Sequence, residues 1–260
     1  MNENPRSHST IGKPQSATEP AIQFRDVSLR MRDGKPLVEG LSFDVFRGET
    51  LVLLGRSGSG KTTTLKLINR LLDPTSGDVR VESNATTRWD PIELRRHIGY
   101  VIQETGLFPH FNVERNIGLV PRLKAWPEPK IRERVRELLD MVGLNAGVFA
   151  SRYPRELSGG QRQRVGVARA LAADPPIVLM DEPFGALDPL TRAELQREFA
   201  ALTERLNKTI VFVTHDIREA FTLASRIGLF KDGHLVELGT PHEFAASEDP
   251  EARAFNESIE

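Results

Sequence analysis

The segment from Gly55 to Thr62 constrains the fold of this chain more than any other feature of its sequence. It reads Gly-Arg-Ser-Gly-Ser-Gly-Lys-Thr and fits the phosphate-binding pattern G-x-x-x-x-G-K-[ST] at every fixed position. A short apolar run, Thr50–Leu54, precedes it, and a helical spacing of apolar residues over Thr62–Leu72 follows it. The pattern predicts a buried strand, a glycine-rich loop and a helix, the arrangement that binds a nucleoside triphosphate.

The residues of this loop have separate expected roles. The glycines let successive backbone N–H groups face phosphate oxygens, and the start of the following helix adds a partial positive charge. Lys61 is expected to reach the β- and γ-phosphates, and the Thr62 hydroxyl is expected to ligate Mg²⁺. The loop residues predicted to bind the nucleotide are Gly55, Arg56, Ser57, Gly58, Ser59, Gly60, Lys61, Thr62 and Thr63.

Length and composition exclude several classes of protein. The chain has 260 residues and 39% hydrophobic content, enough for one domain with an added subdomain and a sizeable core. The net charge is −1 and no Lys/Arg run forms a stripe, so we expect no nucleic-acid partner. No apolar run could span a bilayer, and the first twenty residues lack the apolar segment of a secretory signal, so we expect a cytosolic chain. The absence of cysteine rules out disulfides and thiolate metal sites.

The chain divides into four predicted parts. Residues 1–20 are polar and lack periodicity, which predicts a mobile tail. Strands alternate with helices over 21–104 and 174–245, which predicts an α/β core with a parallel sheet covered on both faces. Residues 105–173 between them have helical periodicity and are predicted to form an inserted helical subdomain. Residues 246–260 are expected to form a short C-terminal tail.

Apolar patterning supplies the individual elements. Runs of alternating or continuous apolar residues predict strands at Ile22–Leu29, Leu41–Phe46, Asp78–Glu82, Ile98–Gln103, Ile177–Met180 and Thr209–Val213. Residues that fall on one helical face predict helices around Ile131, Val135, Leu138, Leu139 and Val142, over Arg162–Ala173, and around Leu195, Phe199, Leu202 and Leu206.

Two carboxylates, Asp181 and Glu182, end the apolar run that begins at Ile177. In a phosphate-loop fold, an Asp at the end of a buried strand holds Mg²⁺, and the next carboxylate can take a proton from the attacking water. The alternative is that the two carboxylates simply form a solvated acidic strand end. For the pair taken alone, the two interpretations have about even odds. The phosphate-binding loop upstream favours the metal and general-base interpretation.

A second glycine-rich segment precedes the helical run Arg162–Ala173. It consists of Leu157, Ser158, Gly159, Gly160 and Gln161. Ser158 suits a helix N-cap, and the glycines allow an anion to approach the backbone closely. A plain Ser-Gly-Gly loop is the alternative. The order of this segment and the Asp181-Glu182 pair resembles that of the signature motif in ATP-binding cassette (ABC) ATPases.

Further residues match this family in order, and the resemblance covers about residues 21 to 240. Gln103 resembles the Q-loop glutamine, Asp188 lies in a segment similar to the D-loop, Ala186-Leu187-Asp188, and His215 resembles the switch histidine. The resemblance implies the catalytic residues Glu182, His215, Lys61 and Gln103, and the metal ligands Thr62, Gln103 and Asp181.

The resemblance also implies a fold, cofactors and partners. The fold is expected to be an α/β P-loop NTPase with a mainly parallel core sheet, an N-terminal antiparallel β part and the inserted helical subdomain. ATP and Mg²⁺ are the expected cofactors. Two copies are expected to pair head to tail, so that Ser158 of one copy serves the nucleotide of the other. A transmembrane permease is expected to dock near Gln103–Asn112, which places the chain peripherally on the cytoplasmic face of the membrane.

The docking segment and the adenine site each leave an alternative open. Leu107, Phe108 and Phe111 are unusually apolar for a free loop, but they could instead pack the helical subdomain. Members of the family usually have an aromatic residue that stacks on adenine, and Met31 occupies the apparent equivalent position here. Met31 is predicted to be a weaker platform, unless another residue covers the base.

Longer phrases around the motifs are similar to the glycine betaine/choline uptake ATPases. They include Leu65–Gly77, Ile98–Gln103 with Gly106–His110, and Met180–Arg192. They imply import of a quaternary amine with the help of a solute-binding protein. Amino-acid, sulfonate and efflux systems share similar phrases, and a soluble ATPase without a permease is a further alternative.

Overall fold

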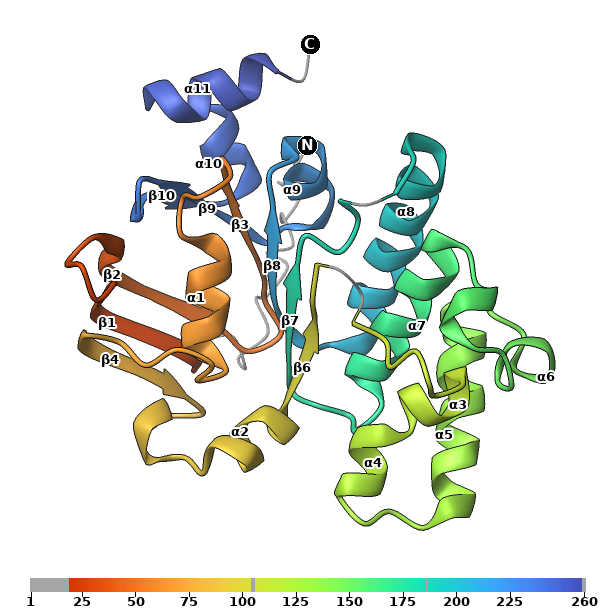
Figure 1. Cartoon of the computed structure of the whole chain (residues 1–260). Helices are drawn as coiled ribbons and strands as arrows, with labels where there is room; N and C mark the ends of the chain where they lie inside the picture. The colour runs from red at the N-terminus through yellow and green to blue at the C-terminus, as the bar shows by residue number, and fades with distance from the viewer. Residues whose placement is uncertain (1–18, 104–105, 186, 259–260) are drawn as a thin grey trace, which may run out of the picture.

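The computed structural model of the chain describes residues 19–103, 106–185 and 187–258. The mobile tail predicted for 1–20 lies almost entirely outside these residues. The remainder forms two sheets with helices between and around them (Figure 1). None of the helices in the described part of the chain is long and apolar enough to cross a membrane.

The larger sheet has six strands in the order β10-β9-β3-β8-β7-β6. Every neighbouring pair is parallel except β10 with β9, so the mainly parallel core sheet is confirmed. All residues of the three central strands are buried, as expected for strands covered on both faces. The strands are β3 (Thr50–Gly55), β6 (Ile98–Val101), β7 (Ile177–Asp181), β8 (Thr209–Thr214), β9 (Arg226–Lys231) and β10 (His234–Gly239).

The smaller sheet is antiparallel and has the strand order β2-β1-β4-β5. It confirms the antiparallel β part predicted near the N-terminus. Its strands are β1 (Pro20–Arg30), β2 (Pro36–Phe46), β4 (Ser76–Val81) and β5 (Asn84–Ala85). Helix α1 (Lys61–Ile68) packs between the two sheets, because Leu65, Leu67 and Ile68 are buried in the core that both sheets share.

The larger sheet separates two hydrophobic cores. Side chains alternate between the faces of a strand, and on β3 Leu51 and Leu53 join the core beneath the antiparallel sheet. Val52 and Leu54 join the second core, which contains the inserted helices. The larger sheet is therefore covered on both faces, which fixes the positions of the loops that follow its parallel strands.

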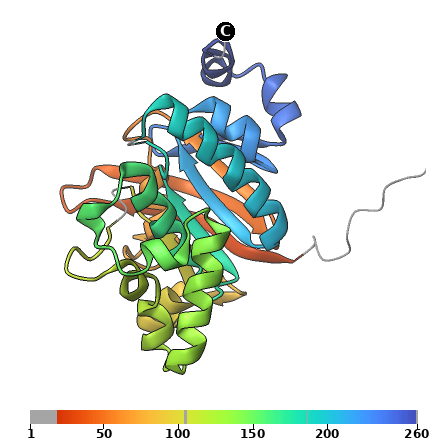
Figure 2. The same cartoon turned by 90° about the vertical axis from the view of Figure 1, so that its right-hand side faces the viewer.

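The segment between β6 and β7 is helical, and in Figure 2 its helices form the lower green part of the molecule. Ile131, Val135, Leu138 and Leu139 are buried on one face, as their spacing predicted. The helices of this segment are α3 (Val113–Ile117), α4 (Leu119–Leu123), α5 (Glu128–Met141), α6 (Ala146–Phe149) and α7 (Gly159–Leu171). The division of the chain into core and subdomain stays a prediction.

Several expected boundaries differ from the structure. The strand expected over Ile98–Gln103 ends at Val101, so Gln103 follows the strand instead of ending it. The helix expected over Thr62–Leu72 ends at Ile68, because Arg70 has φ 53° and the N–H of Leu71 turns back to the carbonyl of Lys66. The C-terminal tail expected at 246–260 contains a helix, α11 (Pro250–Glu257). The other helices are α2 (Pro91–His97), α8 (Pro189–Leu206), α9 (Ile217–Leu223) and α10 (Pro241–Ala245).

Candidate active site

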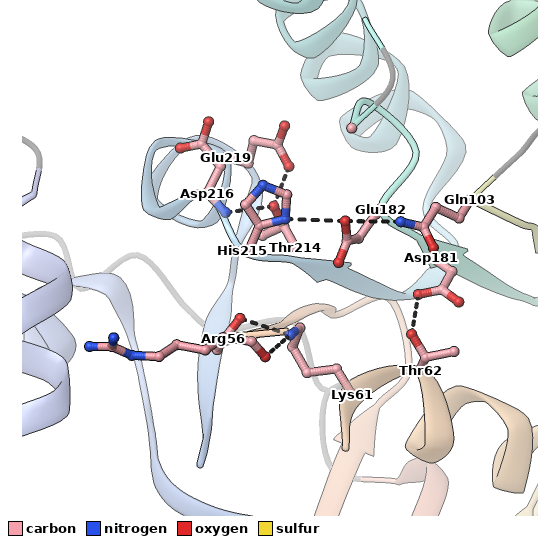
Figure 3. Close-up of polar contacts among 12 residues, drawn as sticks. Arg56, Lys61, Thr62, Gln103, Asp181, Glu182, Thr214, His215, Asp216 and Glu219 are labelled. Carbon is pink, nitrogen blue, oxygen red and sulfur yellow. Dashed lines mark hydrogen bonds and ion pairs between the residues drawn. The ribbon is translucent and has the colours of Figure 1, made fainter. Parts of the chain in front are cut away.

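Four parallel strands bring the candidate residues to one edge of the larger sheet. The phosphate-binding loop follows β3, Gln103 follows β6, Glu182 follows β7 and His215 follows β8. The carboxyl ends of parallel strands lie at the same edge, so residues distant in sequence meet there. Figure 3 shows these side chains grouped around Glu182 and Lys61.

The phosphate-binding loop leaves the first backbone N–H groups of α1 without a side-chain cap. Gly60 is the N-cap residue, with φ 106° and no side-chain hydrogen bond. Gly55 packs so closely that a Cβ there would lie 2.4 Å from the carbonyl oxygen of Phe230. The loop thus presents unpaired N–H groups at a helix N-terminus, which is an anion-binding arrangement.

Lys61 is buried, and its ammonium group is held by the loop itself. Its side chain donates hydrogen bonds to the carbonyl oxygens of Gly55 at 2.7 Å and Arg56 at 2.8 Å (Figure 3). Burial lowers the pKa of Lys61 from its ordinary value. Within the described residues the ammonium group bonds to carbonyl oxygens, and the charges of Glu182 and Asp181 act on it from beyond ion-pair distance. Phosphate oxygens would therefore be its direct anionic partners.

Thr62, in the first turn of α1, faces Asp181 at the end of β7. The Thr62 hydroxyl donates to a carboxylate oxygen of Asp181 at 2.8 Å, and the Tyr100 hydroxyl lies 3.5 Å from the other oxygen. Asp181 is only 4% exposed, and burial raises its pKa from the ordinary value. A hydroxyl and a carboxylate are oxygen ligands of the kind that Mg²⁺ prefers. The predicted pair is therefore adjacent and chemically suited to this metal.

Glu182 is the centre of the third group. Its backbone is in the left-handed region with φ 43°, and its N–H donates to the carbonyl of Val213 at 3.0 Å. One carboxylate oxygen accepts a hydrogen bond from the Gln103 amide at 3.3 Å, and His215 Nδ1 lies 3.1 Å from the same oxygen (Figure 3). Three of the four predicted catalytic residues are thus in direct contact.

A cleft of about 310 Å³ opens over these residues. It is lined by Leu37, by Ser57 through Thr63, by Gln103 and by Glu182. Met31 lies outside this lining and is 42% exposed, so its contact with adenine stays a prediction. None of the signature residues 157–161 lines the cleft as the structure describes it.

The signature segment forms a capped helix start. Ser158 is the N-cap of α7, and its hydroxyl accepts a hydrogen bond from the Gln161 N–H at 3.2 Å. The Gln161 amide oxygen accepts from the Ser158 N–H at 3.0 Å in return, which completes a capping box. The predicted N-cap role of Ser158 is confirmed, while its role in binding nucleotide stays a prediction.

Asp188 also has a structural role in this chain. Its side chain caps α8 by accepting a hydrogen bond from the Thr191 N–H at 3.1 Å. This hydrogen bonding holds the pKa of Asp188 below its ordinary value. Ala186, the first residue of the predicted D-loop, lies outside the described residues.

A buried carboxylate that the sequence analysis missed supports the His215 segment. Glu219 is 3% exposed and accepts hydrogen bonds from the Thr214 hydroxyl at 2.5 Å and from the Gln196 amide at 2.8 Å. Burial raises the pKa of Glu219, and Asp216 raises it further, whereas Arg192 lowers it. The local sequence around Glu219, in the first turn of α9, did not indicate a buried carboxylate, because its hydrogen-bond partners come from β8 and α8.

Replacing Glu219 with Gln should change stability in a pH-dependent way. The folded protein holds the Glu219 proton more tightly than the unfolded chain does, because burial raises its pKa above 4.5. The carboxylate therefore costs no stability below that pH, and the cost appears as pH rises through the folded pKa. Urea denaturation should show the free energy of unfolding of Glu219→Gln rising relative to wild type between about pH 4 and 8. A pH-independent difference would contradict this.

The fold and site together define a phosphate-loop nucleotide-binding protein. The family model for ABC transporters matches residues 38–185, more than half of the chain, and the chain belongs to this family. It is 36% identical, with a TM-score of 0.76, to the dimeric ATP-binding cassette MJ0796 in a post-hydrolysis state bound to ADP and Pi. That alignment covers 84% of this chain and 98% of the other.

Two curated relatives are also similar to it. The chain is 54% identical over 222 residues to the glycine betaine/carnitine/choline transport ATP-binding protein OpuCA of Bacillus subtilis. It is 49% identical over 220 residues to the glycine betaine uptake system ATP-binding protein YehX of Escherichia coli. Each match covers 85% of this chain, but the chain spans 58% of the length of OpuCA and 71% of YehX.

Proposed function

We propose that the chain is the ATP-hydrolysing subunit of an ABC importer for small quaternary amines. The observation that carries the ATPase assignment is the convergence at one sheet edge of Lys61, the Thr62–Asp181 pair and the Glu182–His215 pair. These groups supply a cation for phosphate oxygens, oxygen ligands for a metal and a carboxylate for a water molecule.

The expected mechanism assigns one task to each group. Lys61 and the uncapped N–H groups of α1 bind the β- and γ-phosphates and neutralise their charge. Glu182 accepts a proton from the attacking water, while His215 and Gln103 hold its carboxylate in place. Thr62 and Asp181 would hold Mg²⁺. The ion would supply positive charge against the negative charge that develops on the phosphate oxygens.

The site requires a second copy of the chain. The signature residues do not line the described cleft, although the helix start at Ser158 is suited to an anion. A head-to-tail homodimer would place Ser158 of one copy over the phosphate loop of the other. The relative MJ0796 was captured as a dimer with ADP and Pi, which supports this arrangement.

The permease is proposed to dock on the segment from Gln103 to Asn112, of which residues 104–105 lie outside the described residues. Buried Asn116 organises this loop by bonding to both backbone groups of Phe108 and to the carbonyl of Phe111. Phe108 remains 40% exposed and packs against His110 and Phe111, so it does not fill the core. An adjoining groove of about 300 Å³, which Phe108 helps to line, offers space for a partner helix.

Replacing Phe108 with Asp should uncouple the chain from its permease. A charge in an apolar contact is expected to weaken docking by about 10-fold or more, while ATP binding stays unchanged. Copurification with the permease and solute uptake measure this effect. Val236→Asp is the matched control, because Val236 is 41% exposed but lies on β10, away from this loop. Normal copurification of Phe108→Asp would refute the docking site.

The solute assignment rests on the relatives. OpuCA is named for glycine betaine, carnitine and choline transport and YehX for glycine betaine uptake, and a quaternary amine is therefore the proposed solute class. The importer would also include a solute-binding protein, and the chain would lie peripherally on the inner face of the membrane. An ABC system for another solute is the second candidate, because nothing in the described cleft would contact the transported molecule.

Uptake of labelled glycine betaine and choline at high osmolarity tests the solute assignment. Cells would carry either the wild-type gene or the Glu182→Gln variant at the native locus. Uptake that is lost only in the variant supports quaternary-amine import. Equal uptake in both strains would refute the solute class, and a screen of amino acids, sulfonates and efflux substrates would follow.

A further inference from the structure

The C-terminal helix α11 contacts the phosphate-binding loop through one carboxylate. Glu251 accepts a hydrogen bond from the Arg56 guanidinium at 2.6 Å, and its other oxygen lies 3.3 Å from Lys231 Nζ. The side chain of Glu251 is only 11% exposed, whereas that of Arg56 is 73% exposed. Hydrogen bonding to Arg56 holds the pKa of Glu251 below its ordinary value. One carboxylate therefore joins the loop, the end of β9 and α11.

The Glu251 carboxylate has a fixed position. Asp249 caps α11 by accepting hydrogen bonds from the N–H groups of Glu251 and Ala252 at 2.8 and 3.1 Å. Ala252 is fully buried, and the Asn256 amide donates to the carbonyl of Phe244 in α10 at 3.2 Å. The helix is thus attached to the body of the protein, and Glu251 can restrain whatever it binds.

Arg56 is well placed to transmit that restraint to the nucleotide site. Its carbonyl oxygen accepts hydrogen bonds from Lys61 Nζ at 2.8 Å and from the Ser59 N–H at 3.2 Å. Its side chain points away from Lys61 in Figure 3. The backbone of Arg56 therefore belongs to the phosphate site, while its side chain is bound outside the site by α11.

We propose that Glu251 is a positioning residue that holds the phosphate loop, through Arg56, in the conformation that binds nucleotide. The inference rests on the proposed ATPase function. Ordering a loop before the ligand arrives reduces the entropy lost on binding and raises affinity. Glu251 contacts the loop through the outward-pointing Arg56 side chain and lies outside the Glu182 group, so it acts on nucleotide affinity and leaves the chemical step unchanged.

The test measures ADP affinity by titration, and KM and kcat for ATP, and compares these quantities between four proteins. These are wild type, Glu251→Gln, Arg56→Gln and the double variant. Because the ion pair is partly exposed, each single variant should bind ADP about 2–5-fold more weakly, with KM rising alike and kcat nearly constant. The double variant should match Glu251→Gln, because that change already breaks the Arg56 contact along with the Lys231 contact. The difference from wild type should shrink in high salt.

Glu257→Gln is the matched control, because it makes the same Glu-to-Gln change at an exposed position of the same helix, α11. It should bind ADP as wild type does. Arg56→Lys should restore part of the affinity that Arg56→Gln loses. Unchanged or tighter ADP binding by Glu251→Gln, or additive losses in the double variant, would overturn the inference and leave the ATPase assignment intact. Failure of the wild-type chain to bind ADP would refute both.

Discussion

Replacing Glu182 with Gln is expected to lower steady-state ATP hydrolysis by about 10²–10⁴-fold while ATP still binds. The amide keeps the shape of the side chain but cannot accept a proton from water. Glu182 bonds to Gln103 and His215, whereas Lys61 is held by the loop carbonyls, so the phosphate-binding groups should stay in place. Phosphate release from the purified proteins, together with ATP titration, measures the two effects separately.

Glu133→Gln provides the control for this variant. Glu133 is exposed on α5, outside the candidate site, and the same chemical change there should leave hydrolysis at the wild-type rate. Near-normal hydrolysis by Glu182→Gln would show that another group takes the proton. Loss of ATP binding in that variant would show that Glu182 shapes the nucleotide site instead.

Replacing Lys61 with Ala is expected to weaken ATP binding by about 10–100-fold, the scale of losing charge-assisted hydrogen bonds. The buried ammonium group is the cation that the loop carbonyls hold at the cleft. Hydrolysis should fall with affinity, because the β- and γ-phosphates lose their charge partner. Equilibrium titration with ATP measures the change, and circular dichroism checks that the variant folds.

Lys124→Ala is the matched control, because Lys124 is an exposed residue that follows α4. Its ATP affinity should equal that of wild type. Wild-type affinity in Lys61→Ala would contradict the role of Lys61 as the cation that binds the phosphates, since backbone N–H groups alone would then account for binding.

The parts of the fold that sequence predicted correctly depend on short-range patterns. Continuous apolar runs marked β3, β7 and β8, because a strand buried on both faces is mostly apolar, with its few polar side chains at the ends. The loop glycines and the cap at Ser158 are also local, since each is set by residues a few positions apart. The meeting of Glu182 with His215 followed only from the parallel order of the strands and from family resemblance.

The sequence could not predict features that depend on contacts between distant segments. Apolar spacing continued to Leu72, but the chain turns at Arg70, whose guanidinium reaches the carbonyl of Trp89. Helix α11 is short and buries one residue, Ala252, so few apolar positions marked it in the sequence. The Glu251–Arg56 contact joins residues 195 positions apart, and no local spacing encodes it.

Oligomeric state with and without nucleotide tests the central claim, that two copies of this chain enclose ATP between a phosphate loop and a signature segment. Sedimentation of Glu182→Gln would be measured in ATP with Mg²⁺, in ADP and without nucleotide. The account predicts a species of twice the mass of one copy in ATP alone, and a single copy when Lys61→Ala is added to the variant. A single copy at saturating ATP, or a dimer that ignores nucleotide, would contradict it.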